Sequence, residues 1–317
     1  MNTNLDSSLS FDFDAEVSSS GKEQLPLEPF AFGKKARLVD GSGFIYRAFY
    51  AMPQMVNKKG EPVGAVYGFC SMMLPLLNQQ NDLFCVVLDA GRNTFRNEIY
   101  PEYKSNRAET PADLKSQFSK LLKACEAFGL PVIEMNGYEA DDIIATYAAK
   151  LSKVGYSVEI VSSDKDLMQL VSDNVCLFDP VKSKTIGRDE VFQKYGVYPE
   201  QMITLQTLMG DSTDNIPGIK GVGPKTAAKL VNQFATISEM YENIDSVTPL
   251  RIREMLAAQR DTLKISEQLV TLRRDVPIDE KFSELTVKWD ENRLLEFFSD
   301  NEFYSLVRRI KNGAVCR

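Results

Sequence analysis

The sequence contains no histidine, and this absence removes several kinds of chemistry at once. An imidazole cannot serve as general base, and metal sites ligated by histidine are excluded. The five cysteines are scattered and form no Cys-x-x-Cys motif, which is typical of free thiols in a reducing cytosol. The sequence also has no apolar run long enough to span a membrane and no signal-peptide core. We therefore expect a cytoplasmic protein that does not bind a membrane.

The net charge of −7 is unevenly distributed along the 317 residues. Residues 1–33 carry six acids and one base, whereas the rest of the chain carries 38 acids and 36 bases. The first segment is rich in serine and acid and lacks apolar periodicity, which predicts a disordered extension. A docking segment for a partner is the alternative. We expect an α/β domain over residues 34–198 and a helical region over residues 199–317.

Three apolar runs end in aspartate, at Asp40, Asp89 and Asp164. Buried strands that alternate with helices predict a mostly parallel sheet flanked by helices. Because ligands bind at the carboxyl ends of the strands in such sheets, we expect these three side chains to meet at one edge. Other periodicities predict helices over 43–52, 64–77, 111–128, 188–195, 201–209 and 292–310, and strands over 130–135 and 175–179.

Residues 137–142 place three carboxylates, Glu139, Asp141 and Asp142, at the start of an amphipathic helix. Acids in a first turn suit the helix dipole, but the dipole accounts for only one or two of them. Adjacent carboxylates repel one another unless a cation offsets their charge. Mg²⁺ and Mn²⁺ prefer hard oxygen ligands, whereas Zn²⁺ usually takes histidine or cysteine. We therefore expect a site for Mg²⁺ or Mn²⁺, to which Asp166 adds another acid.

The segment after Asp89, residues 91–107, interleaves basic and aromatic side chains. They are Arg92, Phe95, Arg96, Tyr100, Tyr103, Lys104 and Arg107. This combination suits phosphate pairing and base stacking on a single strand, and a solvated charged loop is the alternative. Its position directly after a predicted metal ligand favours nucleic-acid binding. Tyr46 and Arg47 follow Asp40 and lie near the same edge, where the arginine can hold a phosphate.

Residues 210–230 combine acids, glycines and lysines. Asp211 and Asp214 come first, three positions apart, and the following glycine-rich turn leads into a helix that begins with proline. Such a turn presents backbone N–H groups at a helix N-terminus, where phosphate binds without sequence readout. The spacing is not that of a Walker A loop. The pattern indicates a helix–hairpin–helix whose contacts are Gly218, Lys220, Gly221, Gly223, Lys225 and Thr226.

From about Lys34 to Ile310 these segments, in this order, resemble the 5′-nuclease family, and within it the 5′–3′ exonuclease domain of bacterial DNA polymerase I. The matching blocks are LVDGSGFIYRAFYAMP, LDAGRNTFR, PEYKSNR, GYEADD, SSDKDL, GDSTDNIPG and IKGVGPKTAAKL. The resemblance implies a PIN-like fold and two or more divalent ions. It gives the first ion Asp40, Asp89, Glu139 and Asp141. It gives the second ion Asp164, Asp166 and Asp214, with Asp141 between the two ions and with Asp142 and Asp211 acting through water.

The resemblance also implies a function, that of a metal-dependent 5′–3′ exonuclease and flap endonuclease in primer removal and DNA repair. The resemblance implies a helical arch in which Lys104 would touch the scissile phosphate and Arg96 and Arg107 would hold the 5′ strand. The implied DNA contacts are Tyr46, Arg47, Arg96, Tyr103, Lys104, Arg107 and the hairpin residues. A monovalent cation such as K⁺ would bind at the hairpin. We expect a monomer in the bacterial cytosol. Its expected partners are 5′ flaps, nicks, duplex 5′ ends, RNA primer strands and a separate DNA polymerase.

Three other function classes fit parts of the sequence. A PIN-type nuclease that acts on RNA shares acid-tipped strands, but the hairpin and the basic segment favour structured DNA. A module that binds flaps without cutting would not need the complete set of acids. A structural protein with an acidic surface patch would not place acids at the ends of three strands.

Overall fold

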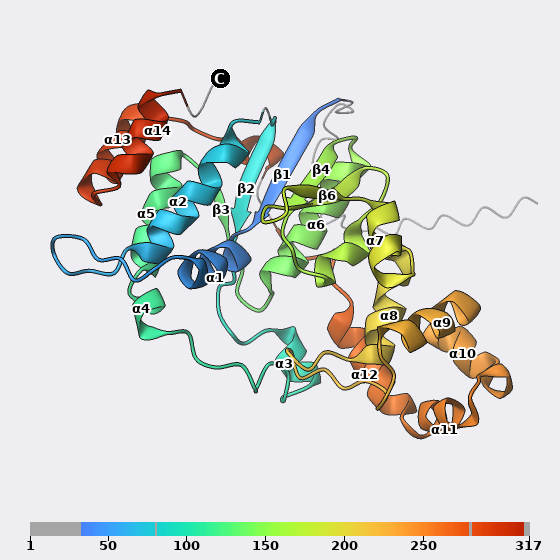
Figure 1. Ribbon diagram of the computed structural model, residues 1–317. Coiled ribbons are helices and arrows are strands. Elements are labelled where there is room, and N and C mark those ends of the chain that lie inside the picture. Colours follow the sequence, from blue (N-terminus) through green and yellow to red (C-terminus); the bar gives the residue numbers. More distant parts are fainter. Residues whose placement is uncertain (1–32, 80, 279–280, 314–317) are drawn as a thin grey trace, which may run out of the picture.

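The computed structural model describes residues 33–79, 81–278 and 281–313 (Figure 1). The extension predicted for residues 1–33 lies, apart from Gly33, outside the described residues, and so does Cys316. The other four cysteines are free thiols, as expected. No helix in the described part of the chain has the length and apolar character needed to cross a membrane.

One six-stranded sheet organises residues 35–186, with the order β3-β2-β1-β4-β5-β6. The strands are β1 (Lys35–Asp40), β2 (Leu83–Val87), β3 (Val132–Ile133), β4 (Ser157–Val161), β5 (Val175–Asp179) and β6 (Lys184–Ile186). All neighbouring pairs are parallel except β5 and β6. The predicted α/β fold with a mostly parallel sheet is confirmed.

Helices surround this sheet and then form a second region. The α-helices are α1 (Gly41–Ala51), α2 (Gly64–Leu77), α3 (Phe95–Ile99), α4 (Ala112–Lys115), α5 (Phe118–Phe128), α6 (Ala140–Lys153), α7 (Arg188–Tyr195), α8 (Met202–Met209), α9 (Pro224–Phe234), α10 (Ile237–Glu242), α11 (Leu250–Ala258), α12 (Arg260–Val270), α13 (Glu291–Asp300) and α14 (Tyr304–Lys311). The 3₁₀ helices are η1 (Asp166–Leu170), η2 (Pro199–Gln201), η3 (Ile244–Ser246) and η4 (Phe282–Glu284).

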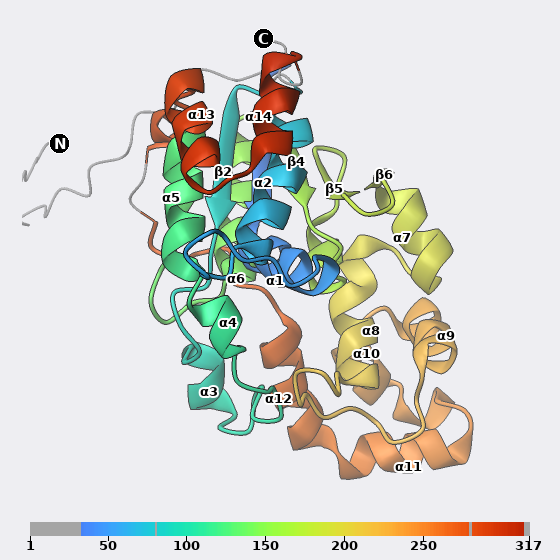
Figure 2. The same ribbon diagram turned by 60° about the vertical axis from the view of Figure 1, so that its left-hand side comes forward.

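The strands carry apolar side chains on both faces, so both faces are buried. Ala36 and Leu38 of β1 pack in the same cluster as α6, α8 and α9. Val39, on the opposite face, packs with α1, α2 and α5, and this cluster also receives α13 and α14. Figures 1 and 2 show α8 to α12 beyond the edge of the sheet at which β1 and β2 end. The sheet therefore presents the carboxyl ends of its strands to the helical region.

Several boundaries differ from those predicted. The helix predicted over 111–128 is divided into α4 and α5, and the side-chain oxygen of Gln117 between them accepts the N–H of Ala65 at 2.9 Å. The helix predicted over 292–310 is divided into α13 and α14, and Glu302 between them has a φ of +62°. Strand β6 was not predicted because three mostly exposed residues at an antiparallel edge give no apolar pattern.

Candidate metal centre and nucleic-acid interface

The ends of β1 and β4 are joined through one hydroxyl group. Asp40 ends β1, and its Oδ1 accepts the N–H of Gly43 at 2.8 Å, which caps α1. Its Oδ2 accepts the Ser162 hydroxyl at 2.9 Å, and the same hydroxyl oxygen accepts the N–H of Asp164 at 3.1 Å. A Cβ at Gly43 would lie 2.3 Å from Oδ2 of Asp40, so only glycine leaves room for this carboxylate.

The end of β2 is joined in a similar way to the start of α6. Oδ1 of Asp89 accepts the N–H of Ala140, the first residue of α6, at 2.8 Å. The N–H of Asp89 donates to the Ser42 hydroxyl of α1 at 3.0 Å. Glu139 is the N-cap residue of α6. The sheet edge thus brings the predicted acids together from four separate segments, as expected from the positions of the strands.

The convergence of these acids is visible in their pKa values. Burial raises the pKa of Asp40 to about 6, and the charges of Asp164 and Asp89 add to the rise against hydrogen bonds that lower it. Burial and the charges of Asp164 and Asp40 also raise the pKa of Asp141 well above its ordinary value. Burial and Asp164 raise the pKa of Asp166 to about 7. Such repulsion is the condition that bound cations relieve.

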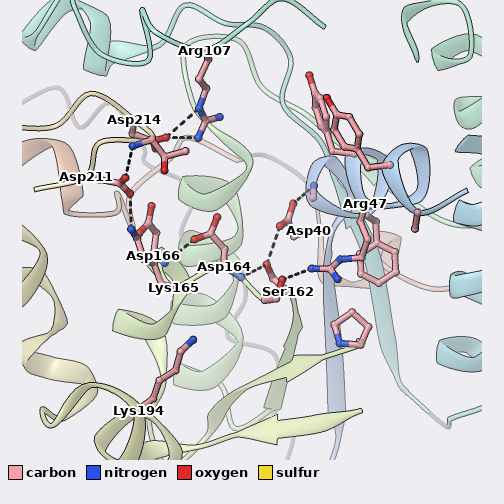
Figure 3. Close-up of a pocket in the computed structure, with 18 of the residues that line it drawn as sticks. Asp40, Arg47, Arg107, Ser162, Asp164, Lys165, Asp166, Lys194, Asp211 and Asp214 are labelled. Atoms are coloured by element: carbon pink, nitrogen blue, oxygen red, sulfur yellow. Dashed lines mark hydrogen bonds and ion pairs between the residues drawn. The ribbon is translucent and has the colours of Figure 1, made fainter. Parts of the chain in front are cut away.

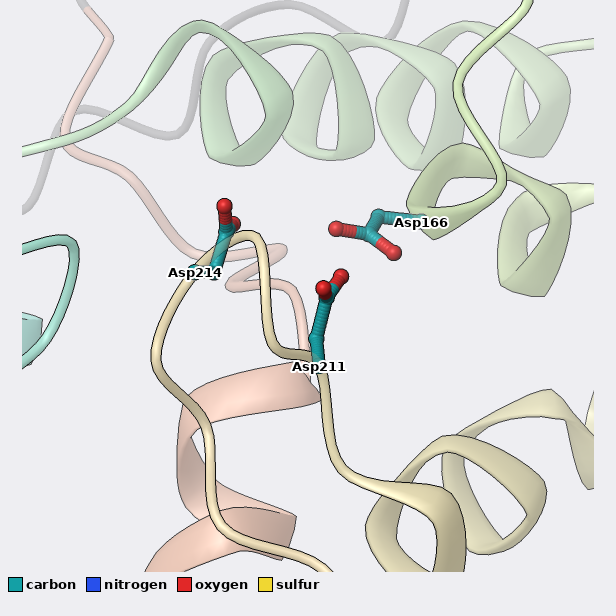
Figure 4. Close-up of side chains that lie close together, drawn as sticks. All are labelled: Asp166, Asp211 and Asp214. Atoms are coloured by element: carbon teal, nitrogen blue, oxygen red, sulfur yellow. The ribbon is translucent and has the colours of Figure 1, made fainter. Parts of the chain in front are cut away.

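A second group of acids lies beside the first. Asp166, Asp211 and Asp214 each offer a carboxylate oxygen, and these oxygens lie within 4.8 Å of one another (Figure 4). Three carboxylates are a hard donor set that fits Mg²⁺ or Mn²⁺ and does not fit a metal that needs histidine or cysteine. Asp211, for which the resemblance implies a role through water, lies directly in this triad, and the role of Asp164 at this ion stays a prediction. Gln206 donates to Asp166 from α8.

Basic side chains neutralise part of this charge (Figure 3). Lys165 pairs with Asp211 at 2.7 Å, and Arg107 pairs with Asp214. Lys104 lies 2.6 Å from Glu139 and 3.7 Å from Asp214. Although burial raises the pKa of Glu139, Lys104 and Arg96 outweigh it and hold the pKa below its usual value.

The turn that carries these basic residues is docked on the loop that carries Asp214. The N–H of Lys104 donates to the backbone oxygen of Asp214 at 2.9 Å, and Lys104 has a φ of +55°. The Asn106 amide donates to the oxygen of Ser212 at 2.7 Å, and the Asn215 amide donates to that of Glu102 at 2.8 Å. A non-glycine residue in the left-handed region is held there at a cost, so the docking determines where Lys104 points.

Two of the predicted site residues form a buried ion pair instead. Arg96 is 1% exposed and donates to both oxygens of Asp142, at 2.6 and 2.9 Å. It also donates to the backbone oxygen of Leu269 at 2.8 Å. Asp142 is fully buried and accepts the N–H of Arg273 as well. The prediction that Arg96 contacts DNA is wrong because its N–H donors are used inside the protein. Asp142 is not placed to bind a metal because its oxygens already accept from Arg96 and Arg273.

Two further predicted DNA contacts pack within the protein: Tyr103 is buried, and Gly218 is half-buried against neighbouring backbone. Tyr103 is 5% exposed, and its hydroxyl donates to Oε2 of Glu139 at 3.0 Å, so it orients a carboxylate rather than stacking on a base. Gly218 packs against the backbone of Met209 and Gly210, where a Cβ would come within 2.3 Å of the Gly210 nitrogen. This glycine is needed for a close backbone approach inside the loop.

The other hairpin residues lie at the surface. Lys220, Gly221, Gly223 and Lys225 are exposed, and Thr226 is half-buried. Gly223 is the N-cap residue of α9, and Pro224 is its first residue, as the sequence predicts. This arrangement leaves a helix N-terminus with two nearby lysines open to solvent, which suits a phosphate group.

A cavity of about 810 Å³ opens over the acids. Its lining includes Arg47, Arg107, Lys165 and Lys194 together with the aspartates. Tyr46 also lines the cavity, is 38% exposed and shares a hydrogen bond with Thr110 at 2.8 Å. The space holds many water molecules, each of which occupies roughly 30 Å³ of liquid, so hydrated ions fit in it.

Sequence reasoning missed several residues of the site. Ser162 and Lys165 lie inside the Ser-Ser-Asp-Lys-Asp block and could have been found by asking which neighbours orient the acids. Gln206 gave one weak signal, a polar residue among the apolar positions of α8. Lys194 gave none, because a lysine near the end of a short surface helix is ordinary.

Comparison with known proteins places the chain in a family. Residues 35–196 match the 5′–3′ exonuclease N-terminal resolvase-like domain, and residues 197–293 match the 5′–3′ exonuclease C-terminal SAM fold. The chain belongs to the 5′–3′ exonuclease family. The sequence-based resemblance is thereby confirmed, and the predicted helix–hairpin–helix falls within the second matched segment.

Three relatives show how far the similarity extends. DNA polymerase I of Rhizobium leguminosarum is 44% identical over 289 residues, which are 88% of this chain and 28% of the relative. The 5′–3′ exonuclease of Aquifex aeolicus is 37% identical over 279 residues, 87% of this chain and 95% of the relative. The solved bacteriophage T5 D15 flap endonuclease, in a complex with DNA and metal ions, has a TM-score of 0.63 and 26% identity over 86% of this chain and all of that one. The chain spans about a third of the DNA polymerase I relatives.

The pKa values predict how stability depends on pH in the presence of a chelator. Asp40 and Asp166 have raised pKa values of about 6 and about 7 against an ordinary value of 3.8. The folded state therefore holds more protons than the unfolded state, and the free energy of unfolding should fall by several kcal/mol as the pH rises from about 4 to 7. Urea titrations at several pH values, with EDTA or with Mg²⁺, measure this fall.

The matched variants are Asp166→Asn and Asp113→Asn. The first removes one repelling charge and should flatten the fall in EDTA, whereas the second changes an exposed residue of α4 and should leave it unchanged. Mg²⁺ should also flatten the fall, because cations that bind only the folded state stabilise it. Equal slopes for the wild type and for Asp166→Asn would show that the acids do not repel one another.

Loss of the buried ion pair between Arg96 and Asp142 should lower the free energy of unfolding. Asp142→Asn keeps the shape of the side chain but leaves Arg96 without its main counter-charge, and breaking a buried pair costs about 3–5 kcal/mol. We expect the free energy of unfolding, measured by urea titration in EDTA, to fall by about 3 kcal/mol. Asp113→Asn should change it by less than about 0.5 kcal/mol. A loss below about 1 kcal/mol for Asp142→Asn would mean that the pair is not structural.

Proposed function

We propose that the protein hydrolyses phosphodiester bonds in DNA at 5′ ends and 5′ flaps, with Mg²⁺ or Mn²⁺ bound by the clustered carboxylates. The observation that carries this proposal is the convergence of acids at the strand ends beside basic residues from a separate segment. The ligands proposed for one ion are Asp40, Asp89, Glu139 and Asp141, and those for another are Asp166, Asp211 and Asp214. Asp164 lies between the two groups, as its effect on the pKa values of Asp40, Asp141 and Asp166 indicates.

The bound ions would lower the pKa of a water molecule and stabilise the leaving 3′ oxygen. The side chains of the protein position the reacting groups and neutralise their charge. Lys104 and Arg107 have carboxylate partners, and a phosphate entering the cavity offers them a second partner of the same sign. A cation that contacts the scissile phosphate stabilises the charge that develops there. Tyr103 holds Glu139 in place from the buried side.

The proposed strand path joins three surfaces. The exposed hairpin at Lys220–Lys225 grips the backbone of the downstream duplex, and a K⁺ ion at this hairpin would add to the grip. Arg47 donates to the hydroxyl of Ser163 at 2.7 Å and is available to the strand near the acids. The terminal base pair must open for the scissile linkage to reach the acids, which costs a few kcal/mol and less at a flap. Preference for 5′ flaps, nicks and 5′ ends follows from that cost.

The relatives support this proposal. The Aquifex aeolicus protein is named a 5′–3′ exonuclease, and the T5 protein is a flap endonuclease solved with DNA and metal ions. Other relatives are DNA polymerases, and a DNA polymerase that supplies flaps is the partner we propose. Removal of RNA primers and of damaged 5′ ends in the bacterial cytosol is the corresponding cellular role.

The first functional prediction concerns Asp164. Asp164→Asn removes one charge from the centre of the acid cluster and should abolish cleavage of a 5′-flap substrate in Mg²⁺, while the affinity for DNA in EDTA stays within about twofold. Cleavage is followed on a 5′-flap, a nicked and a blunt duplex, with Mg²⁺, Mn²⁺ and EDTA in parallel.

Asp113→Asn, on the exposed surface of α4, serves as the matched control and should cleave as the wild type does. Full activity of Asp164→Asn with Mg²⁺ would refute the assignment of this acid to the metal centre. Binding of flaps by the wild type without any cleavage would instead indicate a recognition module.

The second functional prediction concerns Lys104. Lys104→Ala should lower the single-turnover rate by about 100-fold, because a cation beside the reacting phosphate acts mainly in the transition state. Its affinity for the flap should fall by less than about threefold. Lys115→Ala, which removes an exposed lysine of α4, is the control. Equal losses of rate and affinity would make Lys104 a docking contact only.

A further inference from the structure

The cations that line the cavity divide into two classes. Lys165 pairs with Asp211, and Arg107 pairs with Asp214. Arg47 donates only to the hydroxyl of Ser163, and Lys194 lies over the ring of Tyr195 at 4.9 Å. Within the described residues, neither Arg47 nor Lys194 has a carboxylate within ion-pair distance. These two side chains are therefore the ones whose charge is available to an incoming anion.

Lys194 and Arg107 approach the acids from different sides. Figure 3 shows Arg107 above the acid cluster and Lys194 below it, with the amino group of Lys194 directed toward Asp164. Arg107 belongs to the segment proposed to hold the 5′ strand. A strand that enters past Arg107 and places its scissile phosphate at the acids must leave on the other side. Lys194 stands on that side.

The helix that carries Lys194 is also tied to the hairpin helix. Lys194 is in the last turn of α7, which is followed by its C-cap residue Gly196 with a φ of +72°. The backbone oxygen of Gly196 accepts the Asn232 amide from α9 at 2.7 Å. A Cβ at Gly196 would lie 3.6 Å from that of Ala228 on the same helix. Lys194 is thus held between the acid cluster and the helix whose N-terminus carries the exposed hairpin.

We propose that Lys194 binds a backbone phosphate of the cleaved strand on the 3′ side of the scissile linkage, and so extends the hairpin grip up to the acids. This proposal rests on the function proposed above. The ligand chemistry is one phosphodiester anion, without base recognition, because an exposed lysine presents a point charge and no planar donor set. Lys194 positions the strand and takes no part in bond breaking.

The test combines variants of Lys194 with single-phosphate changes in the DNA. Lys194→Ala should weaken binding of a 5′-flap substrate in EDTA by roughly fivefold at low salt and reduce the slope of log affinity against log salt by about one. Its cleavage rate at saturating substrate with Mg²⁺ should stay within about twofold. Lys194→Arg, which keeps the charge, should bind nearly as the wild type does.

A methylphosphonate removes the charge of one phosphate, and a series of substrates carries it at successive positions on both sides of the scissile linkage. In the wild type, one position on the 3′ side should reproduce the loss seen for Lys194→Ala. At that position Lys194→Ala should show no further loss, because both partners of one contact are then absent. Lys123→Ala, on the exposed surface of α5, is the matched control and should show no such position.

Unchanged affinity in Lys194→Ala, or a loss that adds to every methylphosphonate equally, would overturn the proposal. A coupled position on the 5′ side would also overturn it, because the strand would then run in the opposite direction. The binding measurements need no catalysis. If the wild type binds flaps with a coupled 3′ phosphate but does not cleave them with Mg²⁺ or Mn²⁺, the hydrolytic function fails while the Lys194 contact stands.

Discussion

Repulsion between carboxylates is the constraint on which the rest of this structure depends. Asp40 ends β1, Asp89 and Asp164 follow the ends of β2 and β4, and the start of α6 adds more acids at the same edge. Their mutual repulsion adds to burial in raising the pKa values of Asp40, Asp141 and Asp166. A fold that only needed stability would separate these groups, because each unit of pKa shift corresponds to about 1.4 kcal/mol. Cations bound at the proposed sites would turn this repulsion into binding.

The protein handles the excess charge in two different ways. In the interior, Arg96 and Asp142 form a bidentate pair whose remaining donors and acceptors are satisfied by backbone groups. That pair joins α3, α6 and the end of α12, so it fixes the base of the basic segment against both domains. At the cavity, Lys104 and Arg107 neutralise carboxylates through partly exposed pairs that a phosphate can rearrange. A buried pair supports geometry, whereas an accessible pair can exchange partners.

Much of the site could be predicted from the sequence because strand ends converge by topology. Asp40, Asp89 and Asp164 follow apolar runs, and a parallel sheet leaves only one edge for them. The role of Arg96 could not be predicted in this way. A sequence shows that a residue is charged and which residues lie next to it in the chain. Asp142, the partner of Arg96, is 46 residues away in the sequence. Burial is a tertiary property, and a basic segment with aromatics has the same composition whether its arginine faces DNA or the core.

Contacts between distant segments also determine where Lys194 and Asp211 lie. Lys194 reaches the cavity because α7 is fastened to α9 through Gly196 and Asn232, a contact between segments 36 residues apart. Asp211 joins its triad because Lys165 and a backbone N–H orient its oxygens. The contact between α7 and α9 and the pairing of Lys165 with Asp211 have no local pattern. Motifs therefore identify which residues carry charge, and tertiary contacts decide which charges remain available.

The availability of these charged side chains also links the binding of the DNA strand to the binding of the cations in the proposed reaction. Glu139 and Asp214 are shared between basic residues of the 91–107 segment and the proposed cation sites. A phosphate that draws Lys104 and Arg107 away from these carboxylates leaves the carboxylates free for cations. By linkage, cations on the carboxylates leave the basic residues free for the strand. Strand and cations then favour each other's binding, so the electrostatic repulsion that burdens the folded protein favours assembly of the site when both are present.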